Sequence, residues 1–144
     1  MQIKINYQIT DEDADVIIAE VRKINSPFLG GETPVSFIIQ LINEEHKMEG
    51  GIIAWMRPGI HLLCIDWLWI PEHLRKKGYG TKLVLAAENE GLKAGCSHSQ
   101  LETLPFQHAV PFYQNLGYAE IGRLKGFYGD HDAIYMRKNL KTSE

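Results

Sequence analysis

The segment from Leu62 to Ile70 is almost wholly apolar and is interrupted only by Asp66. A near-continuous apolar run of this length is typical of a strand at the centre of a sheet, covered by other elements on both faces. Pro71 ends the run, and a helical pattern follows from about Tyr79 to Ala94. The chain therefore has to fold around a central strand that leads through a short loop into a helix.

The other elements follow from periodicity and turn residues. The expected order is a strand, a helix, three strands, a helix, a strand, a helix and two strands. This order predicts an α/β (α+β) three-layer sandwich, in which a mixed, mostly antiparallel twisted sheet of about six to seven strands has helices on both faces. The expected strands are Gln2–Gln8, Val35–Ile42, Gly50–Met56, Leu62–Ile70, Ser99–Leu104, Ala119–Leu124 and Ala133–Lys138, and the helices run from Thr10 to about Ile24, from about Tyr79 to Ala94 and from Ala109 to Leu116.

Length and composition fit one domain over residues 1–144. Hydrophobic residues make up 44% of the chain, enough for a sizeable core without a disulfide or metal. Lys and Arg total 15 against 18 Asp and Glu, and without a basic excess nucleic acid is not an expected partner. The two cysteines, Cys64 and Cys96, are expected to be reduced thiols in the core.

No segment indicates export or a membrane. The N-terminal residues show neither a long apolar run nor a small-residue cleavage site. The longest apolar stretch is far shorter than the ~20 residues that a membrane helix needs. We therefore expect a cytoplasmic protein with no membrane partner. The six histidines lack the spacing of metal ligands, so no metal is predicted.

The loop after the central strand carries the strongest chemical signal. It reads Arg75-Lys76-Lys77-Gly78-Tyr79-Gly80-Thr81. Two glycines at this spacing allow a tight turn whose N–H groups point into one concavity, just before the positive end of a helix. The loop predicts a site for a diphosphate; the alternative is an ordinary glycine turn with solvated lysines. It lacks the third small residue of a dinucleotide fingerprint, and it does not have the residue order of a P-loop.

Two motifs resemble those of the GCN5-related N-acetyltransferase (GNAT) superfamily. The loop from Arg75 to Gly80 is similar to the family's pyrophosphate loop, Gln/Arg-x-x-Gly-x-Gly/Ala. The segment from Ala109 to Tyr118 is similar to its second motif, Ala-x-x-Phe/Leu-Tyr-x-x-x-Gly-Phe/Tyr. The resemblance covers roughly Gly50 to Leu140. It implies a GNAT-like fold and acetyl-CoA as cosubstrate.

The resemblance also implies how the coenzyme is held. Backbone N–H groups from Lys76 to Thr81 would bind the pyrophosphate, and the strand edge at Leu68 to Ile70 would hydrogen-bond the pantetheine arm as an added strand does. A splay between this strand and the next would make the slot for the arm. Where the family often has an asparagine, this chain has Phe106. The expected coenzyme-binding residues are Leu68, Trp69, Ile70, Arg75, Lys76, Lys77, Gly78, Tyr79, Gly80 and Thr81.

Two residues are the candidates for proton transfer. Tyr113 matches the family tyrosine that commonly protonates the leaving thiolate, and a phenol with a pKa of ~10 still carries its proton at neutral pH. Its alternative role is packing in the helix, with the hydroxyl bonded to a carbonyl. The family's usual glutamate position holds Cys64, but Asp66 faces the same side two residues on. Burial would raise the pKa of Asp66 and suit it as a base. Its alternative is a structural pair with Lys or His, and Glu102 is a weaker candidate.

The leading interpretation is an N-acetyltransferase that moves an acetyl group from acetyl-CoA to a primary amine by direct attack in a ternary complex. The alternative is a non-catalytic module that binds or senses acyl-CoA on the same fold. The expected acceptor is a small-molecule or peptide amine. Because the family often dimerises through its last strands, a homodimer is a further expectation.

Overall fold

One six-stranded sheet forms the body of the protein in the computed structural model, which describes residues 1–31 and 33–141. The strand order is β1-β2-β3-β4-β6-β5. Only β3 and β4 pair in parallel, and the other neighbours are antiparallel. The predicted mixed, mostly antiparallel sheet with helices is therefore confirmed. Its elements are α1 (Asp11–Asn25), β1 (Val35–Ile42), β2 (Met48–Arg57), β3 (Leu62–Trp69), α2 (Tyr79–Lys93), β4 (His98–Thr103), α3 (Ala109–Asn115), β5 (Ala119–Tyr128) and β6 (His131–Asn139).

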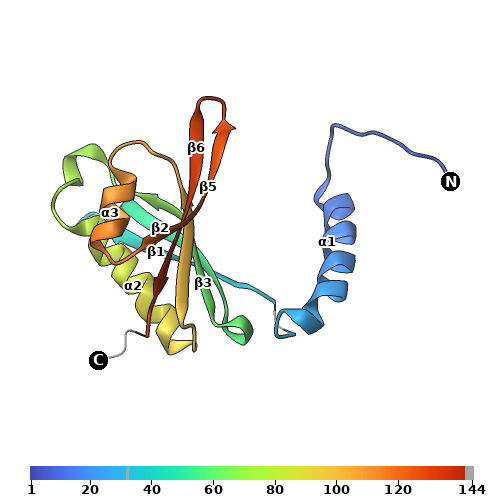
Figure 1. Cartoon of the computed structure of the whole chain (residues 1–144), viewed down its shortest axis with the longest axis horizontal. Helices are drawn as coiled ribbons and strands as arrows, with labels where there is room; N and C mark the ends of the chain where they lie inside the picture. Colours follow the sequence, from blue (N-terminus) through green and yellow to red (C-terminus); the bar gives the residue numbers. More distant parts are fainter. Residues whose placement is uncertain (32, 142–144) are drawn as a thin grey trace.

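The core lies between one face of the sheet and the helices α2 and α3 (Figure 1). Side chains that point to this face alternate along the strands, as the pleat requires. The buried cluster comprises Ile52, Ile65, Leu83, Val84, Ala87, Leu101, Tyr113, Tyr118, Ile134 and Met136. The loop between β3 and α2 and the loop before α3 are thereby fixed at neighbouring places on the same side of the sheet.

The second face of β1, β2 and β3 is open. The apolar run of β3 predicts a strand covered on both faces, but Trp67 is 72% exposed and Trp69 is 54% exposed. The reason is the position of α1, which stands on this side of the sheet but apart from it (Figure 1). None of the residues of α1 is buried.

The strand expected over Gln2–Gln8 is not formed, so that expectation is wrong. Residues 2–8 have no strand pairing, and their apolar side chains, such as Ile3 and Ile5, are exposed. The alternating pattern is present, but a strand also needs a partner for its backbone groups. Because α1 carries this segment away from the sheet, no strand edge lies beside it (Figure 1).

The start of α1 agrees with its sequence pattern. The Thr10 side chain accepts a hydrogen bond from the N–H of Asp13 at 3.2 Å, as an N-cap does. Gly95 and Gly117 adopt left-handed backbone after α2 and α3, with φ of 94° and 93°. This conformation ends a helix at little cost only when the residue is glycine.

Candidate active site

The loop between β3 and α2 leaves a run of backbone N–H groups available. Gly78 is the N-cap of α2 and has no side chain with which to cap it. The first N–H groups of a helix have no partner within the helix. Within residues 76–81, all of which the structure describes, no N–H donates to a turn or cap carbonyl. These donors lie at the positive end of the α2 dipole, where an anion is stabilised.

Arg75 fixes one end of the loop. Its Nε donates to the carbonyl of Ile70 at 3.0 Å, which ties the loop to the end of β3. Lys76 adopts a left-handed backbone with φ of 59°, and Gly78 follows with φ of 85°. The Nζ of Lys82 lies 5.5 Å from the centre of the Tyr79 ring. The predicted loop residues therefore form one turn with several positive charges.

Glycine is required at the two positions of the loop for different physical reasons. At Gly78 a Cβ would meet nothing within 4 Å, so what matters there is the positive φ. At Gly80 the backbone is ordinary, but a Cβ would lie 3.2 Å from the Phe112 ring of α3. Gly80 thus allows the start of α2 to approach α3, which carries Tyr113.

The sheet forks between β3 and β4. Their parallel pairing covers only Leu62 to Ile65 on β3 and His98 to Leu101 on β4. Beyond this point Leu68 and Trp69 pair with β2 alone. The edge of β3 that faces β4 is therefore open along the residues predicted to bind the pantetheine arm, and Ile70 continues from it into the loop.

Tyr113 lies in the core with its hydroxyl unpaired. The residue is 8% exposed, and its ring packs edge-on against Phe112 and Tyr118 at centroid distances of 5.0 and 5.6 Å. Among the described residues none hydrogen-bonds the hydroxyl, and no fully buried polar side-chain atom lacks a partner. The hydroxyl oxygen must therefore reach the surface. Burial of the residue raises the pKa of Tyr113 to about 12, so the phenol keeps its proton.

Asp66 sits in a bulge of β3. Ala54 pairs with Ile65 and Ile53 with Trp67, so Asp66 is the extra residue between them. The Nε1 of Trp55 donates to the Asp66 carboxylate at 3.1 Å, which orients it. The expectation that Asp66 is buried is wrong, because its side chain is exposed on the open face. Because the neighbouring Ile65 points into the core, alternation along β3 puts Asp66 on the opposite face, from which α1 stands apart.

Glu102 lies at the matching position on β4 and is held by two tyrosines. Tyr128 donates to one carboxylate oxygen at 2.9 Å, and Tyr135 donates to the other at 3.1 Å. The hydrogen bond to Glu102 raises the pKa of Tyr128. Sequence reasoning missed these two phenols and Trp55, because all three reach the site only through pairing between strands.

A buried polar network under α2 was also missed. Glu88 is 5% exposed, and its carboxylate pairs with Lys138 Nζ at 2.8 Å. The Tyr118 hydroxyl donates to Glu88 at 3.0 Å and lies 2.7 Å from the Ser99 hydroxyl. The one signal in the sequence is a glutamate on the apolar side of α2, three residues before Gly91. The network joins α2 to β4 and β6.

Cys64 does not have the properties of an acyl carrier. Burial, with a smaller effect of the Asp66 charge, raises the pKa of its thiol to about 11. The thiolate that a nucleophile requires is therefore disfavoured at neutral pH.

Phe106, which stands at the family's asparagine position, packs edge-on against the His131 ring at 4.6 Å. Its side chain has no amide group that could hydrogen-bond a pantetheine arm.

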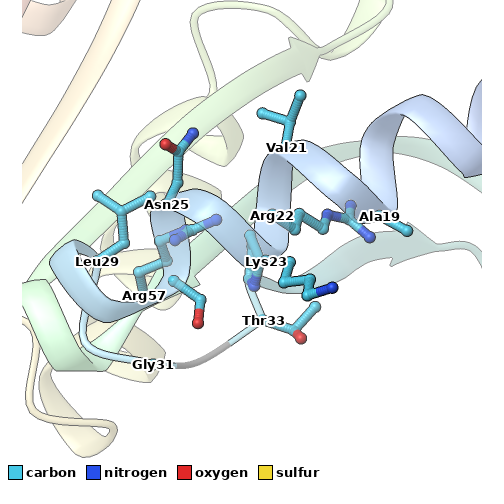
Figure 2. Close-up of a pocket in the computed structure, with 11 residues that line it drawn as sticks. Ala19, Val21, Arg22, Lys23, Asn25, Leu29, Gly31, Thr33 and Arg57 are labelled. Carbon is cyan, nitrogen blue, oxygen red and sulfur yellow. The ribbon is translucent and has the colours of Figure 1, made fainter.

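Outside the fork, a crevice of about 400 Å³ lies between α1, the loop that follows it and Arg57 (Figure 2). It contains none of the predicted site residues.

Within the described residues no group of three or more His, Cys, Asp or Glu side chains is placed to hold a metal ion. In the same part of the chain, no helix combines the length and apolarity needed to cross a membrane.

Comparison with known sequences finds acetyltransferases, both as a family and as individual relatives. Residues 7–118 match the acetyltransferase (GNAT) family. An acetyltransferase from Agrobacterium fabrum (strain C58) is 30% identical over 102 residues, which are 71% of this chain and 72% of that protein. The blasticidin-S acetyltransferase of Streptomyces morookaense is 36% identical over 76 residues, or 52% of this chain and 54% of that protein.

Solved structures share the fold. A crystal structure from Agrobacterium tumefaciens has a TM-score of 0.86 at 22% identity and covers 96% of this chain and 99% of its own. This alignment is long enough to include most of α1. An aminoglycoside 6'-N-acetyltransferase complexed with coenzyme A has a TM-score of 0.68 at 20% identity. The alignment covers 95% of this chain and 98% of that one.

Proposed function

Because this chain belongs to the acetyltransferase (GNAT) family, we propose that it transfers the acetyl group of acetyl-CoA to a primary amine by direct attack in a ternary complex. The family match covers both motifs on which the resemblance rested and extends it into α1. Among relatives, the blasticidin-S acetyltransferase is named for an antibiotic acceptor. We infer a small-molecule amine as acceptor here as well.

The observation that carries the proposal is the run of unpartnered N–H groups at the start of α2. Acetyl-CoA supplies an acetyl group activated as a thioester, and the chain has to hold its diphosphate and its arm. The amides from Lys76 to Thr81 suit the diphosphate because they converge at a helix N-terminus. The charges of Arg75, Lys76 and Lys77 add attraction. The open edge of β3 at Leu68 and Trp69 suits the amide groups of the arm.

Tyr113 supplies the proton for the leaving sulfur. As the new bond from nitrogen to carbon forms, the bond from carbon to sulfur breaks and the sulfur needs a proton. The Tyr113 hydroxyl is protonated, because its pKa is raised to about 12, and no internal acceptor holds it. A hydroxyl that reaches the surface from an otherwise buried ring, with no hydrogen bond inside the protein, is available to donate to a bound sulfur. This feature favours catalysis over the alternative of a binding module.

Asp66 takes the proton that the attacking nitrogen loses. An amine attacks only when neutral, so a base has to accept its proton directly or through water. The Asp66 carboxylate is oriented by Trp55 and lies at the fork, on the sheet face opposite to Tyr113. The two proton carriers thus lie on opposite faces of the sheet. Coenzyme and acceptor would likewise approach from opposite faces of the sheet.

The test combines binding with turnover. In a thermal-shift titration we expect CoA to raise the melting temperature progressively, because a ligand that binds only the folded state stabilises it by mass action. Pantetheine, which lacks the diphosphate, is the matched control and should give little stabilisation. A panel of primary amines with acetyl-CoA, followed by thiol release, identifies the acceptor class. Equal stabilisation by CoA and pantetheine would contradict the assignment of the loop.

A further inference from the structure

We propose that α1 of one copy packs on the uncovered sheet face of a second copy of this chain, and that the second copy returns the same contact. We call this face the open face; it comprises Ile38 of β1, Ile53 and Trp55 of β2, and Cys64, Trp67 and Trp69 of β3. The proposal concerns assembly. It holds whether or not the reaction proposed above is correct.

The first observation is an amphipathic helix without a partner in its own chain. Ile17, Val21 and Ile24 are spaced to form one stripe along α1, and each is at least half exposed. An isolated helix of 15 residues is marginally stable in water, because most helical stability comes from packing of the apolar face. The stripe of α1 therefore requires a surface that its own chain does not supply.

The second observation is an apolar surface without a cover. Ile38 pairs in register with Ile53, and Ile53 pairs with Trp67, so the three side chains form one row across β1, β2 and β3. Their exposed fractions are 51%, 42% and 72%. Contiguous apolar surface of this kind marks an interaction site. A helix with an apolar stripe is the shape that covers a sheet face.

The connection between α1 and β1 fixes where α1 leaves the sheet. Gly30, in that connection, lies so close to Gly59 that a Cβ on it would sit 2.7 Å from the Gly59 Cα. The connection is thereby held at the turn between β2 and β3. From there α1 stands apart from the sheet, and Val21 and Leu29 line the crevice beside it (Figures 1 and 2). The fold shared with the Agrobacterium tumefaciens structure takes in most of α1.

The area is close to what a stable pair requires. A 15-residue helix is about 22 Å long and about 10 Å wide. Two reciprocal contacts of this footprint bury about 900 Å² when both surfaces are counted, and the apolar segment before α1 adds to it. The total approaches the ~1,000 Å² above which interfaces are generally stable and specific.

The exchange would also shape the site. Asp66 and Trp55 lie on the same side of the sheet as the open face. The α1 of the second copy would then form one wall of the acceptor side. This consequence alone rests on the proposed function, and the experiment below does not use activity.

Cysteine cross-linking between two differently tagged chains tests the exchange. One chain carries Val21→Cys and the other Ile53→Cys, both with Cys64→Ser, while the buried Cys96 is kept. After co-expression and mild oxidation we expect a disulfide-linked pair that contains both tags. As control, Leu85→Cys, on the exposed side of α2, replaces Val21→Cys and should give no such pair. Absence of the mixed pair would overturn the proposal, as would a cross-link within one chain that carries both cysteines.

Sedimentation measures the assembly without cross-linking. The unaltered protein should sediment at about twice the 16.4 kDa chain mass. Val21→Asp should halve that mass, because a carboxylate in the apolar contact is costly, whereas Leu85→Asp should leave it unchanged. A monomer at micromolar concentration, or a dimer that Val21→Asp does not weaken, would contradict the exchange.

Discussion

Asp66 and Glu102 are each the first residue beyond the last pair of the parallel strands β3 and β4, which is Ile65 with Leu101. Because successive side chains alternate and the pair itself points into the core, both carboxylates lie on the opposite face. Each is oriented by aromatic donors, Trp55 for Asp66 and the tyrosines 128 and 135 for Glu102. Two carboxylates therefore flank the point where the sheet opens.

The first prediction separates the roles of these two carboxylates. Asp66→Asn should lower kcat by roughly 10²- to 10⁴-fold, because a general base contributes about this much. Glu102→Gln is the matched control and should affect KM for the acceptor more than kcat. Steady-state kinetics with a fixed acceptor and CoA titration of each variant provide the measurement. A larger loss of kcat in Glu102→Gln than in Asp66→Asn would reassign the base.

The second prediction concerns Tyr113. Tyr113→Phe should remove most of the turnover while CoA affinity and the melting temperature stay nearly unchanged, because the hydroxyl has no internal hydrogen bond to lose. Tyr118→Phe is the control with the opposite pattern. It loses bonds to Glu88 and Ser99 and should lower stability by about 1 kcal/mol, with little change in kcat. If Tyr113→Phe keeps full turnover, the phenol is a packing residue.

The third prediction follows from the raised pKa of Tyr113. The folded protein holds this proton up to a pKa of about 12, while the unfolded chain releases it near 10. Turnover should therefore not fall between pH 7 and ~10 for lack of this proton. Above that range the free energy of unfolding should decrease as pH rises, since the unfolded state then binds fewer protons. A pH–rate profile and urea unfolding at several pH values measure both effects. An alkaline loss of kcat near pH 8 that disappears in Tyr113→Phe would contradict the assignment.

The fourth prediction distinguishes the two loop glycines from an unconstrained one. Gly78→Ala should raise KM for acetyl-CoA, because a left-handed backbone costs a residue with a Cβ about 1 kcal/mol. Gly80→Ala should also weaken binding, through the contact with Phe112 at 3.2 Å. Gly122→Ala meets nothing within 4 Å and serves as the control. Isothermal titration with CoA checks the three variants, and equal affinity in all of them would remove the loop from the binding site.

The fifth prediction concerns the ion pair under α2. Lys138→Met should destabilise the protein by roughly 3 kcal/mol, because it leaves the buried Glu88 carboxylate without its counter-charge. The double variant Glu88→Gln, Lys138→Met should recover part of that loss. Lys93→Met breaks the exposed pair with Glu90, also at 2.8 Å, and should cost less than about 1 kcal/mol. Chemical denaturation gives the three values. Similar losses for Lys138→Met and Lys93→Met would show that burial does not matter here.

Features that depend on residues close together in the chain could be predicted from the sequence. The Thr10 cap, the glycines after α2 and α3, and the loop between β3 and α2 all depend on residues close together in the chain. The same holds for the two family motifs, whose residues form the loop at the start of α2 and the helix that carries Tyr113. Such features can be predicted from sequence because the backbone conformation, the caps and the spacing are short-range properties.

The partners of the candidate catalytic residues could not be predicted in this way. Trp55 meets Asp66 because a bulge shifts the register of β2 and β3, and alternation does not reveal a bulge. Glu88 meets Lys138 across 50 residues of sequence. The strand expected at Gln2–Gln8 failed for the same reason, because a strand depends on a neighbour.

The sequence by itself thus determined the family, and it predicted the phosphate loop and the proton donor, since each rests on residue type and short spacing. Only the tertiary structure decided that Asp66 is exposed, that Tyr113 is buried with a free hydroxyl, and that one face of the sheet and the stripe of α1 lack a cover. Burial and pairing are properties of surfaces brought together from distant segments. Their energies therefore depend on the assembled sheet and not on the local chain.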